Sequence, residues 1–317
     1  MSDYPFLDGL LESTDEDLQC FDECFARAIP LTALWRNDND DAKFVTWDSE
    51  LEKYLKHRAE LIDYEGRESF FPWRIYERLG LRWQDGYKFP QQKSDCASFG
   101  HLGSLNASNL TNAILSGRTM PEMIKSIPEI APSIIYGLAR GNGKMNFGAG
   151  LNLNPLSKWA AQKGNYWVSD FGRYDGGANT RKYKPGSTQD TNALKTQSVI
   201  IYLPEPTFEH CYALCAAGIG IHMGTGKYPI SAVTNSDGLA VPSHWKQGGH
   251  AMSFVAAMEI SSRRYICLEN SHGNRYAADR FSPATQPRLW IGQKDFTILA
   301  ATKFRYGNWY GNVGELG

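Results

Sequence analysis

Cys96, in the stretch KSDCASFGH, stands where a thiol has useful chemistry. Polar residues precede it, and the segment that follows, CASFGHLGSLNASNLTNAILS (96–116), has the pattern of a helix with small residues along one stripe. The positive end of a helix lowers the pKa of a thiol, and the thiolate is the nucleophilic form. Taken alone, the pattern favours a buried structural thiol, because free cysteine is among the most buried residue types. A nucleophile at a helix N-terminus becomes the better interpretation only if a base and its orienting partner stand elsewhere in the chain.

A thiol nucleophile needs a base, and the nearest histidine in sequence is a poor one. His101 lies five residues further along the helix, and at about 100° per residue its side chain points away from Cys96. His250 in KQGGHAMSFVAAM is the better candidate, because it opens an apolar strand after two glycines that let another chain segment approach. The next strand ends in RRYICLENSHG, and Asn270 stands at that edge. Adjacent antiparallel strands would place Asn270 beside His250, where its amide oxygen orients the imidazole.

The elements that would hold these side chains divide the chain in two. Helical patterns are predicted at 47–63, 96–116, 128–141 and 154–164, after an earlier one at 14–28. Two glycines on the Cys96 face, Gly100 and Gly103, indicate very close packing there, because glycine otherwise costs about 1 kcal/mol in a helix. Beyond about residue 196, strands are predicted in QSVIIYLPEP, IGIHMGTG, HAMSFVAAMEI, RRYICLENS and DFTILAATKFRY, and one helix in TFEHCYALCAAG. The fold class is therefore α+β, with a cleft between the halves.

Three regions are expected. Residues 1–88 form an acidic, helical N-terminal extension or arm, residues 89–190 a helical lobe, and residues 191–317 a β-rich lobe. Between Asp3 and Glu23 there are eight acidic side chains and no basic one. This arm is interpreted either as a docking segment or as a pro-segment that covers the cleft.

Composition restricts the classes of partner. The 317 residues carry a formal net charge of -1 and no Lys/Arg-rich run, so neither nucleic acid nor an anionic membrane is expected as a partner. The sequence has no apolar stretch long enough for a membrane span and no signal-peptide pattern, and its six cysteines are too few for a disulfide framework. We expect a cytoplasmic protein or a component of a protein assembly. His210, Cys211 and Cys215 suggest a metal site, but no fourth ligand has suitable spacing, and helix packing is the prediction.

Four ordered segments resemble the papain-like cysteine peptidase family. QQKSDCASFGH, GGHAMSFVA and YICLENSHG follow that family's order of Gln, Cys, His and Asn, and NFGAGLNLNPLSKWAAQKG resembles its glycine-rich substrate loop and the helix after it. The resemblance covers about residues 86–310. It implies a two-lobed fold in which a helical lobe carries the Cys and an antiparallel, barrel-like lobe carries the His and Asn. His250 follows Cys96 at somewhat more than the family's usual 130–150 residues, so modest insertions are needed.

The resemblance also assigns roles, and it implies no metal or organic cofactor. Cys96 would be the nucleophile, His250 the general base and acid, and Asn270 the orienting residue. Gln91 would donate to the oxyanion together with the Cys96 backbone N–H, with Gln92 as its rival. Gly148, Gly150 and Gly249 would bind an extended peptide or protein substrate; the segment YDGGANT (174–180) is the second choice for the substrate loop.

The sequence departs from the family pattern beside both ends of the triad. Ala97 follows the nucleophile where the family has an aromatic residue, and His272 stands in SHG where the family has Trp in Ser-Trp-Gly. Without that Trp we expect the contact between His250 and Asn270 to be more open to water. Two further functions therefore stay open: a structural or assembly component, for example of a viral particle, that docks through residues 1–88, and a peptidase kept latent by them.

Overall fold

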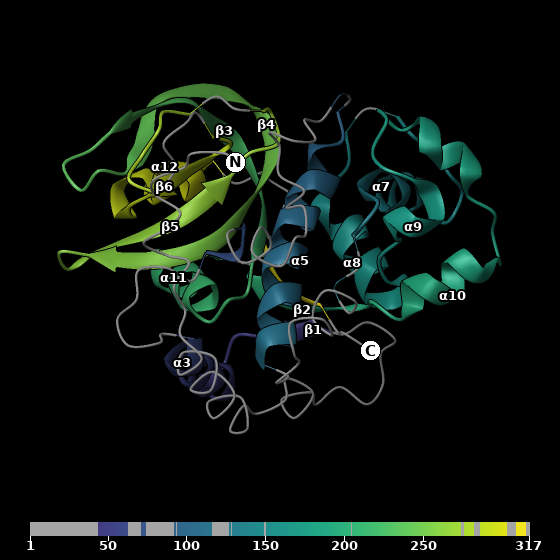
Figure 1. Ribbon diagram of the computed structural model, residues 1–317, viewed down its shortest axis with the longest axis horizontal. Coiled ribbons are helices and arrows are strands. Elements are labelled where there is room, and N and C mark those ends of the chain that lie inside the picture. The colour runs from purple at the N-terminus through teal and green to yellow at the C-terminus, as the bar shows by residue number, and fades with distance from the viewer. Residues whose placement is uncertain are drawn as a thin grey trace, which may run out of the picture.

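The computed structural model describes residues 44–62, 71–73, 92, 94–115, 127, 129–148, 150–203, 205–273, 276–281, 286–302 and 309–314. Gln91 and the helix predicted at 14–28 lie outside the described residues. The described chain separates into a group of helices and a sheet, with the long helix α5 (Cys96–Leu115) running between them (Figure 1). The α+β division predicted from the sequence is therefore confirmed.

The helical half follows α5 in the chain. It contains α7 (Pro132–Arg140), α8 (Leu153–Lys163), α9 (Val168–Phe171), the 3-10 helix η2 (Ala178–Lys182) and α10 (Thr188–Leu194). Their ends carry ordinary stop and start signals: a proline opens α7, and the Asn152 side chain accepts from the backbone N–H of Asn154 at the start of α8. The apolar sides of α7 and α8 enclose one hydrophobic cluster, which also includes Ala97 and Ala251. This cluster joins the helical half to the sheet beside the candidate nucleophile.

The sheet has seven strands in the order β1-β2-β7-β3-β4-β5-β6. They are β1 (Phe44–Thr46), β2 (Ser198–Leu203), β3 (Ile221–Thr234), β4 (Ala240–Ile260), β5 (Arg263–Glu269), β6 (Arg288–Ile291) and β7 (Trp309–Gly314). All neighbours are antiparallel except β1 and β2, and the late strand β7 is inserted between β2 and β3. The helices α11 (Phe208–Ala216) and α12 (Gln293–Ala301) pack on this sheet around a core that includes Phe254, Phe296 and Trp309.

Glycines set the distance between α5 and β4. A Cβ atom on Gly100 would lie 2.8 Å from the backbone oxygen of Met252, and one on Gly103 would lie 2.3 Å from Ser253 Oγ. The close packing predicted from these two glycines is confirmed. It brings the helix that begins at Cys96 against the strand that begins its buried stretch at His250.

Part of the segment predicted as an N-terminal extension belongs to this body. Strand β1 extends the sheet, and α3 (Ser49–Ile62) packs against α11. Arg58 anchors the helix: it is buried, and its Nε donates to the Ala217 carbonyl (2.6 Å) while its Nη2 donates to Asn112 Oδ1 (2.7 Å). The division into three regions remains a prediction, but residues 44–62 pack against the sheet and α11 as part of the same body.

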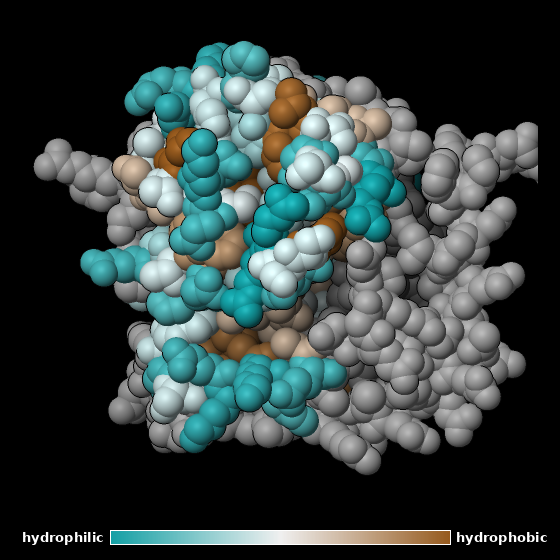
Figure 2. Space-filling model, turned by 90° about the vertical axis from the view of Figure 1, so that its left-hand side faces the viewer, coloured by the Kyte–Doolittle hydropathy of each residue, from teal (hydrophilic) through white to brown (hydrophobic). Residues whose placement is uncertain are grey.

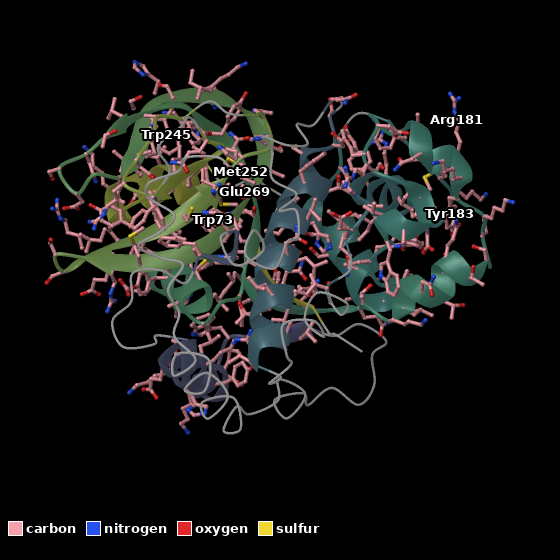
Figure 3. The ribbon with its side chains drawn as sticks, viewed as in Figure 1. Trp73, Arg181, Tyr183, Trp245, Met252 and Glu269 are labelled. Atoms are coloured by element: carbon pink, nitrogen blue, oxygen red, sulfur yellow. The ribbon has the colours of Figure 1, made fainter. Side chains whose placement is uncertain are left out.

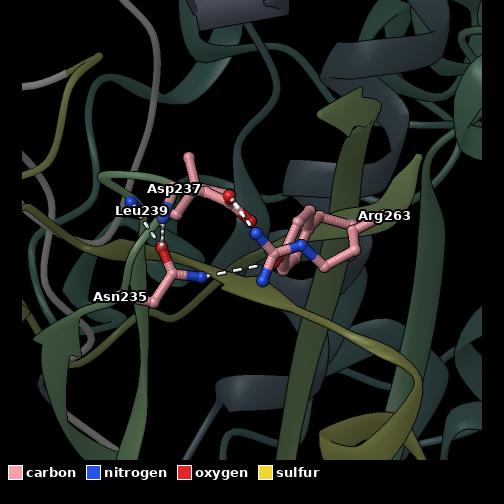
Figure 4. A network of polar contacts seen from close by, with 5 residues as sticks. Asn235, Asp237, Leu239 and Arg263 are labelled. Atoms are coloured by element: carbon pink, nitrogen blue, oxygen red, sulfur yellow. Dashed lines mark hydrogen bonds and ion pairs between the residues drawn. The ribbon is translucent and has the colours of Figure 1, made fainter. Parts of the chain in front are cut away.

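The turn that joins β3 to β4 is tied to the start of β5. Asn235 Oδ1 accepts the backbone N–H groups of Asp237 and Leu239, both at 2.9 Å, which closes the turn locally (Figure 4). Asp237 then forms an ion pair with Arg263 and accepts from the Tyr265 hydroxyl (2.7 Å). The turn therefore fixes the register of β4, the strand that carries His250.

One element was predicted wrongly. The segment DFTILAATKFRY was expected to be a strand, but residues 293–301 form α12. Thr297 and Ile298 gave it strand character. Phe296 and Leu299, three residues apart, are nevertheless both buried in the sheet core, which requires the helical period. Burial on the sheet outweighed local propensity here.

The surface of the sheet half shows hydrophilic residues with apolar residues in separate small groups among them (Figure 2). In the part of the chain that the structure describes, no helix combines the length and the apolar character needed to cross a bilayer.

Candidate active site

Cys96 begins α5 at the junction of the two halves. Its thiol packs against the cluster that contains Ala97 and Ala251, and the backbone amide of Ala251 faces the sulfur. Ala251 directly follows His250 in β4. The fold therefore brings the predicted nucleophile to the strand position next to the predicted base.

His250 and Asn270 are in direct contact across neighbouring strands. His250 Nε2 lies 2.9 Å from Asn270 Oδ1, and both residues are buried, with 5% and 2% of their surfaces exposed. Asn270 follows the last residue of β5, and its backbone N–H donates to the Pro287 carbonyl (2.9 Å). The pairing of β4 with β5 thus sets the two side chains together.

A chain of hydrogen bonds fixes which atoms face each other. The Pro229 carbonyl only accepts, so the Tyr276 hydroxyl donates to it (3.0 Å) and accepts from Asn270 Nδ2 (2.7 Å). The Asn270 oxygen therefore faces His250, and His250 Nε2 carries the proton that this oxygen accepts. The other ring nitrogen, Nδ1, is then the atom that can take a proton from a thiol.

Two further rings enclose His250. The His272 ring stacks on it, with ring centroids 4.1 Å apart and an interplanar angle of 20°. The Tyr228 ring lies 4.8 Å from His250 and 5.7 Å from His272. The expectation that the contact between His250 and Asn270 would be open to water was wrong, because the imidazole of His272 covers His250.

The electrostatic surroundings favour the neutral form of the Cys96 thiol. Burial raises the pKa of Cys96, and the charge of the neighbouring Asp95 raises it further, while the backbone amide of Ala251 opposes both. Asp95 is itself buried and accepts from the Tyr174 hydroxyl at 2.7 Å. A cationic imidazole would therefore be needed to produce the thiolate near neutral pH.

The glycine segment predicted to bind substrate lies beside the start of α5. Gly150 donates its N–H to the Ser94 carbonyl (3.1 Å), and its own carbonyl accepts from Arg140. The Tyr136 hydroxyl contacts both the Ser94 and the Gly148 carbonyls, at 3.0 and 2.8 Å. Burial raises the pKa of Tyr136 to about 12, so this hydroxyl stays protonated. The segment is thus held at the N-terminus of the helix that carries Cys96.

Gly249 and its neighbour Gly248 shape the strand ahead of His250. Gly249 is exposed, and the pairing of β3 with β4 shifts register between Thr225 and Lys227, opposite these glycines. Gly248 has a φ of 151°, which side chains other than glycine rarely adopt. The irregularity lets β4 change from an exposed to a buried strand at His250.

The predicted oxyanion donor, Gln91, lies outside the described residues, so its role stays a prediction. Gln92, the rival candidate, is exposed. Its side chain lies against Gly176: a Cβ atom added to Gly176 would be 2.7 Å from Gln92 Oε1. The Gln92 backbone N–H donates to the Tyr174 hydroxyl (2.9 Å). The Gln92 side chain is thus directed at the 174–177 turn, which does not favour it as the donor.

His101 takes no part in the site. Its Nε2 contacts Asn165 Oδ1 (2.7 Å) and its Nδ1 contacts Asn312 Nδ2 (2.9 Å), so it is a neutral, buried link between α5 and strand β7. Burial lowers its pKa to about 4. His222, whose ring lies 5.8 Å away, is also fully buried, and burial holds its pKa well below the usual value.

A buried ion pair lies behind Asn270. Glu269 Oε2 is 3.3 Å from Arg288 Nη1, and the Arg288 guanidinium stacks over Trp73 at 4.4 Å. Figure 3 shows Glu269 and Met252 close together on the side of the sheet half toward α5. Both line a cavity of about 10 Å³ between helix and sheet, room for a single water molecule.

Metal chemistry finds no support in the described side chains. Cys211 and Cys215 are buried in the sheet core, and His210 stacks on Trp47 at 4.2 Å. Within the described ranges, no group of three or more His, Cys, Asp or Glu side chains is arranged to hold a metal ion.

Comparison with known proteins gives only distant similarity. No protein-family model matches the sequence, and no curated protein matches it. Among solved structures, xylellain, a cysteine protease from Xylella fastidiosa, aligns with a TM-score of 0.47 and 15% identity over 71% of this chain and 82% of its own. Digestive procathepsin L 3 of Tenebrio molitor aligns with a TM-score of 0.46 and 11% identity, over 95% of this chain and 93% of its own. Procathepsin B S9 from Trypanosoma congolense aligns with a TM-score of 0.45 and 11% identity, over 92% of this chain and 89% of its own. All three TM-scores lie below 0.5, and none of the identities exceeds 15%.

Sequence reasoning missed two residues of this site, Tyr228 and Tyr276, and it did not predict that His272 stacks on His250. Their contacts connect segments that are distant in the chain, and no local pattern indicates them. His272 alone gave a signal, as an imidazole two residues after Asn270.

Proposed function

We propose that this chain is a papain-like cysteine peptidase or related amide hydrolase. The supporting observation is the hydrogen bond of 2.9 Å between His250 Nε2 and Asn270 Oδ1, made beside the strand position against which Cys96 packs. Cys96, His250 and Asn270 thereby combine a nucleophile at a helix start, a base and its orienting residue, which is the arrangement that acyl transfer through a thiol requires.

In the proposed reaction, His250 Nδ1 takes the thiol proton and leaves a thiolate beside an imidazolium. The Cys96 sulfur attacks the substrate carbonyl carbon, and the resulting oxyanion accepts from the Cys96 backbone N–H and, in the proposal, from Gln91. His250 then protonates the leaving amine as the C–N bond breaks. Water, deprotonated by His250, attacks the thioester, and the acid product leaves with the free thiol restored. Asn270 keeps the imidazole in the required orientation throughout.

The substrate is proposed to be an extended peptide or protein. Gly148 and Gly150 lie beside the start of α5, held there by Tyr136 and Arg140, so a chain bound along this segment would pass Cys96. Gly249, exposed next to His250, would border the other side.

The test is selective labelling of the thiol. Cys96 should react with iodoacetamide near pH 7, and His250→Ala should abolish the reaction because burial otherwise keeps the thiol protonated. Cys211, Cys215 and Cys267 are buried and serve as internal controls, read by peptide mass spectrometry. Equal labelling of Cys96 in the His250→Ala variant would sink the proposal. Labelling that depends on His250 without hydrolysis of any peptide amide would instead favour a structural or assembly role.

A further inference from the structure

The stacking of the His272 imidazole on the His250 imidazole is a feature of the site that the proposed mechanism does not use. We infer that His272 is a positioning residue for His250 and that its protonation suppresses formation of the Cys96 thiolate at acid pH. The inference rests on the proposed function, because it concerns the charge that His250 must carry to support a thiolate.

The ring of His272 lies over the ring of His250, the proposed general base. Its ring is 4.1 Å from the His250 ring and nearly parallel to it, and its backbone N–H lies 3.3 Å from Asn270 Oδ1. Tyr228 closes a second side, at 4.8 Å from His250 and 5.7 Å from His272. Between these rings and Asn270, the imidazole of His250 has little freedom to rotate.

The stack accommodates one positive charge better than two. A neutral His272 presents an aromatic face to the His250 imidazolium, and such contacts stabilise a cation. Two imidazolium rings at 4.1 Å would repel each other, with little screening because His250 is only 5% exposed. His272 is half-buried and closer to solvent, so it can take the proton at a lower desolvation cost.

The other ionisable groups around the pair do not remove this competition. Tyr228 of β3 faces both rings, but its phenol is no carboxylate that could offset a second positive charge. Asp95 lies beside Cys96 at the start of α5, where its charge already opposes the thiolate. On β5, Glu269 forms an ion pair with Arg288. When His272 becomes charged, His250 therefore loses its proton more easily, and Cys96 remains a thiol.

The experiment replaces the titrating ring with rings that do not titrate. His272→Phe and His272→Trp in the full chain keep a stacked aromatic surface, and His210→Phe is the matched control, because His210 also stacks on a ring, that of Trp47, away from the site. The readout is the rate of Cys96 labelling by iodoacetamide from pH 4.5 to 8. At pH 5.5 we expect both His272 variants to label up to about tenfold faster than the wild type. At pH 8 they should lie within about twofold of it, and His210→Phe should follow the wild type throughout.

Identical acid profiles for the wild type and both His272 variants would overturn the inference. That result is distinct from failure of the proposed function, which is shown by His250→Ala labelling like the wild type. If the variants fail to fold, nitrogen-15 NMR of the wild-type imidazoles decides the question: coupled titration of His250 and His272 supports the inference, and independent single titrations contradict it.

Discussion

The hydroxyl of Tyr276 accepts a hydrogen bond of 2.7 Å from Asn270 Nδ2 and donates one of 3.0 Å to the Pro229 carbonyl. All of this lies in the interior, since Tyr276 is fully buried and Asn270 is 2% exposed. This relay, not the pairing of β4 with β5 alone, decides that the Asn270 oxygen faces His250.

Removing that hydroxyl should weaken both the fold and the site. Tyr276→Phe leaves Asn270 Nδ2 and the Pro229 carbonyl without this partner, which should cost about 1–3 kcal/mol of unfolding free energy. It should also slow Cys96 labelling, because the Asn270 amide loses the contact that holds its nitrogen away from His250. Tyr265→Phe, which removes a hydroxyl bound to Asp237 far from the site, should lose stability without slower labelling. Labelling unchanged in Tyr276→Phe would contradict the orienting role.

Neutralising Asp95 should make Cys96 more acidic. The Asp95 charge raises the pKa of the thiol, so Asp95→Asn, which keeps an oxygen for Tyr174, should increase the labelling rate at pH 6–7. Asp175→Asn is the control, since that carboxylate caps the backbone N–H of Asn179 instead. Slower labelling in Asp95→Asn would mean that its charge acts mainly by holding the imidazolium, and the prediction would be wrong.

Adding a methyl group at Gly100 should separate helix from sheet. Gly100→Ala gains about 1 kcal/mol of helix propensity. Its Cβ would nevertheless meet the Met252 backbone oxygen at 2.8 Å, and such overpacking typically costs about 1–3 kcal/mol. We expect a net loss in urea-induced unfolding. Gly137→Ala in α7 would meet only the flexible end of Met145, so it should be tolerated better. A stabilised Gly100→Ala variant would refute the close contact.

The protein should lose stability in mild acid through His101. Burial lowers its folded-state pKa from 6.5 to about 4, so the unfolded chain binds the proton first. Stability is therefore full above pH 6.5 and declines as the pH falls toward 4, by about 2 kcal/mol between pH 7 and pH 5. His101→Gln should remove this part of the decline, measured by urea unfolding at both pH values. The buried His222 shifts in the same direction and should maintain some slope in the variant. An unchanged slope would show that His101 does not titrate on unfolding.

The sequence by itself determined the local features of this protein. The helix that begins at Cys96, the two-glycine contact on its face, the strands before and after the turn at 261–262, and the division into helical and sheet halves all follow from periodicity and from glycine placement. These are properties of a few consecutive residues, which a sequence states directly.

Tertiary structure decided the rest. The segment 293–301 became helix because Phe296 and Leu299 had to reach the same core, and β7 entered the sheet between β2 and β3, a pairing that no local pattern encodes. The rings of Tyr228 and His272 around His250, and the Tyr276 relay behind Asn270, join residues from separate strands and turns. Such contacts depend on packing and on hydrogen-bond partners that chain folding brings together, so they appear only in three dimensions.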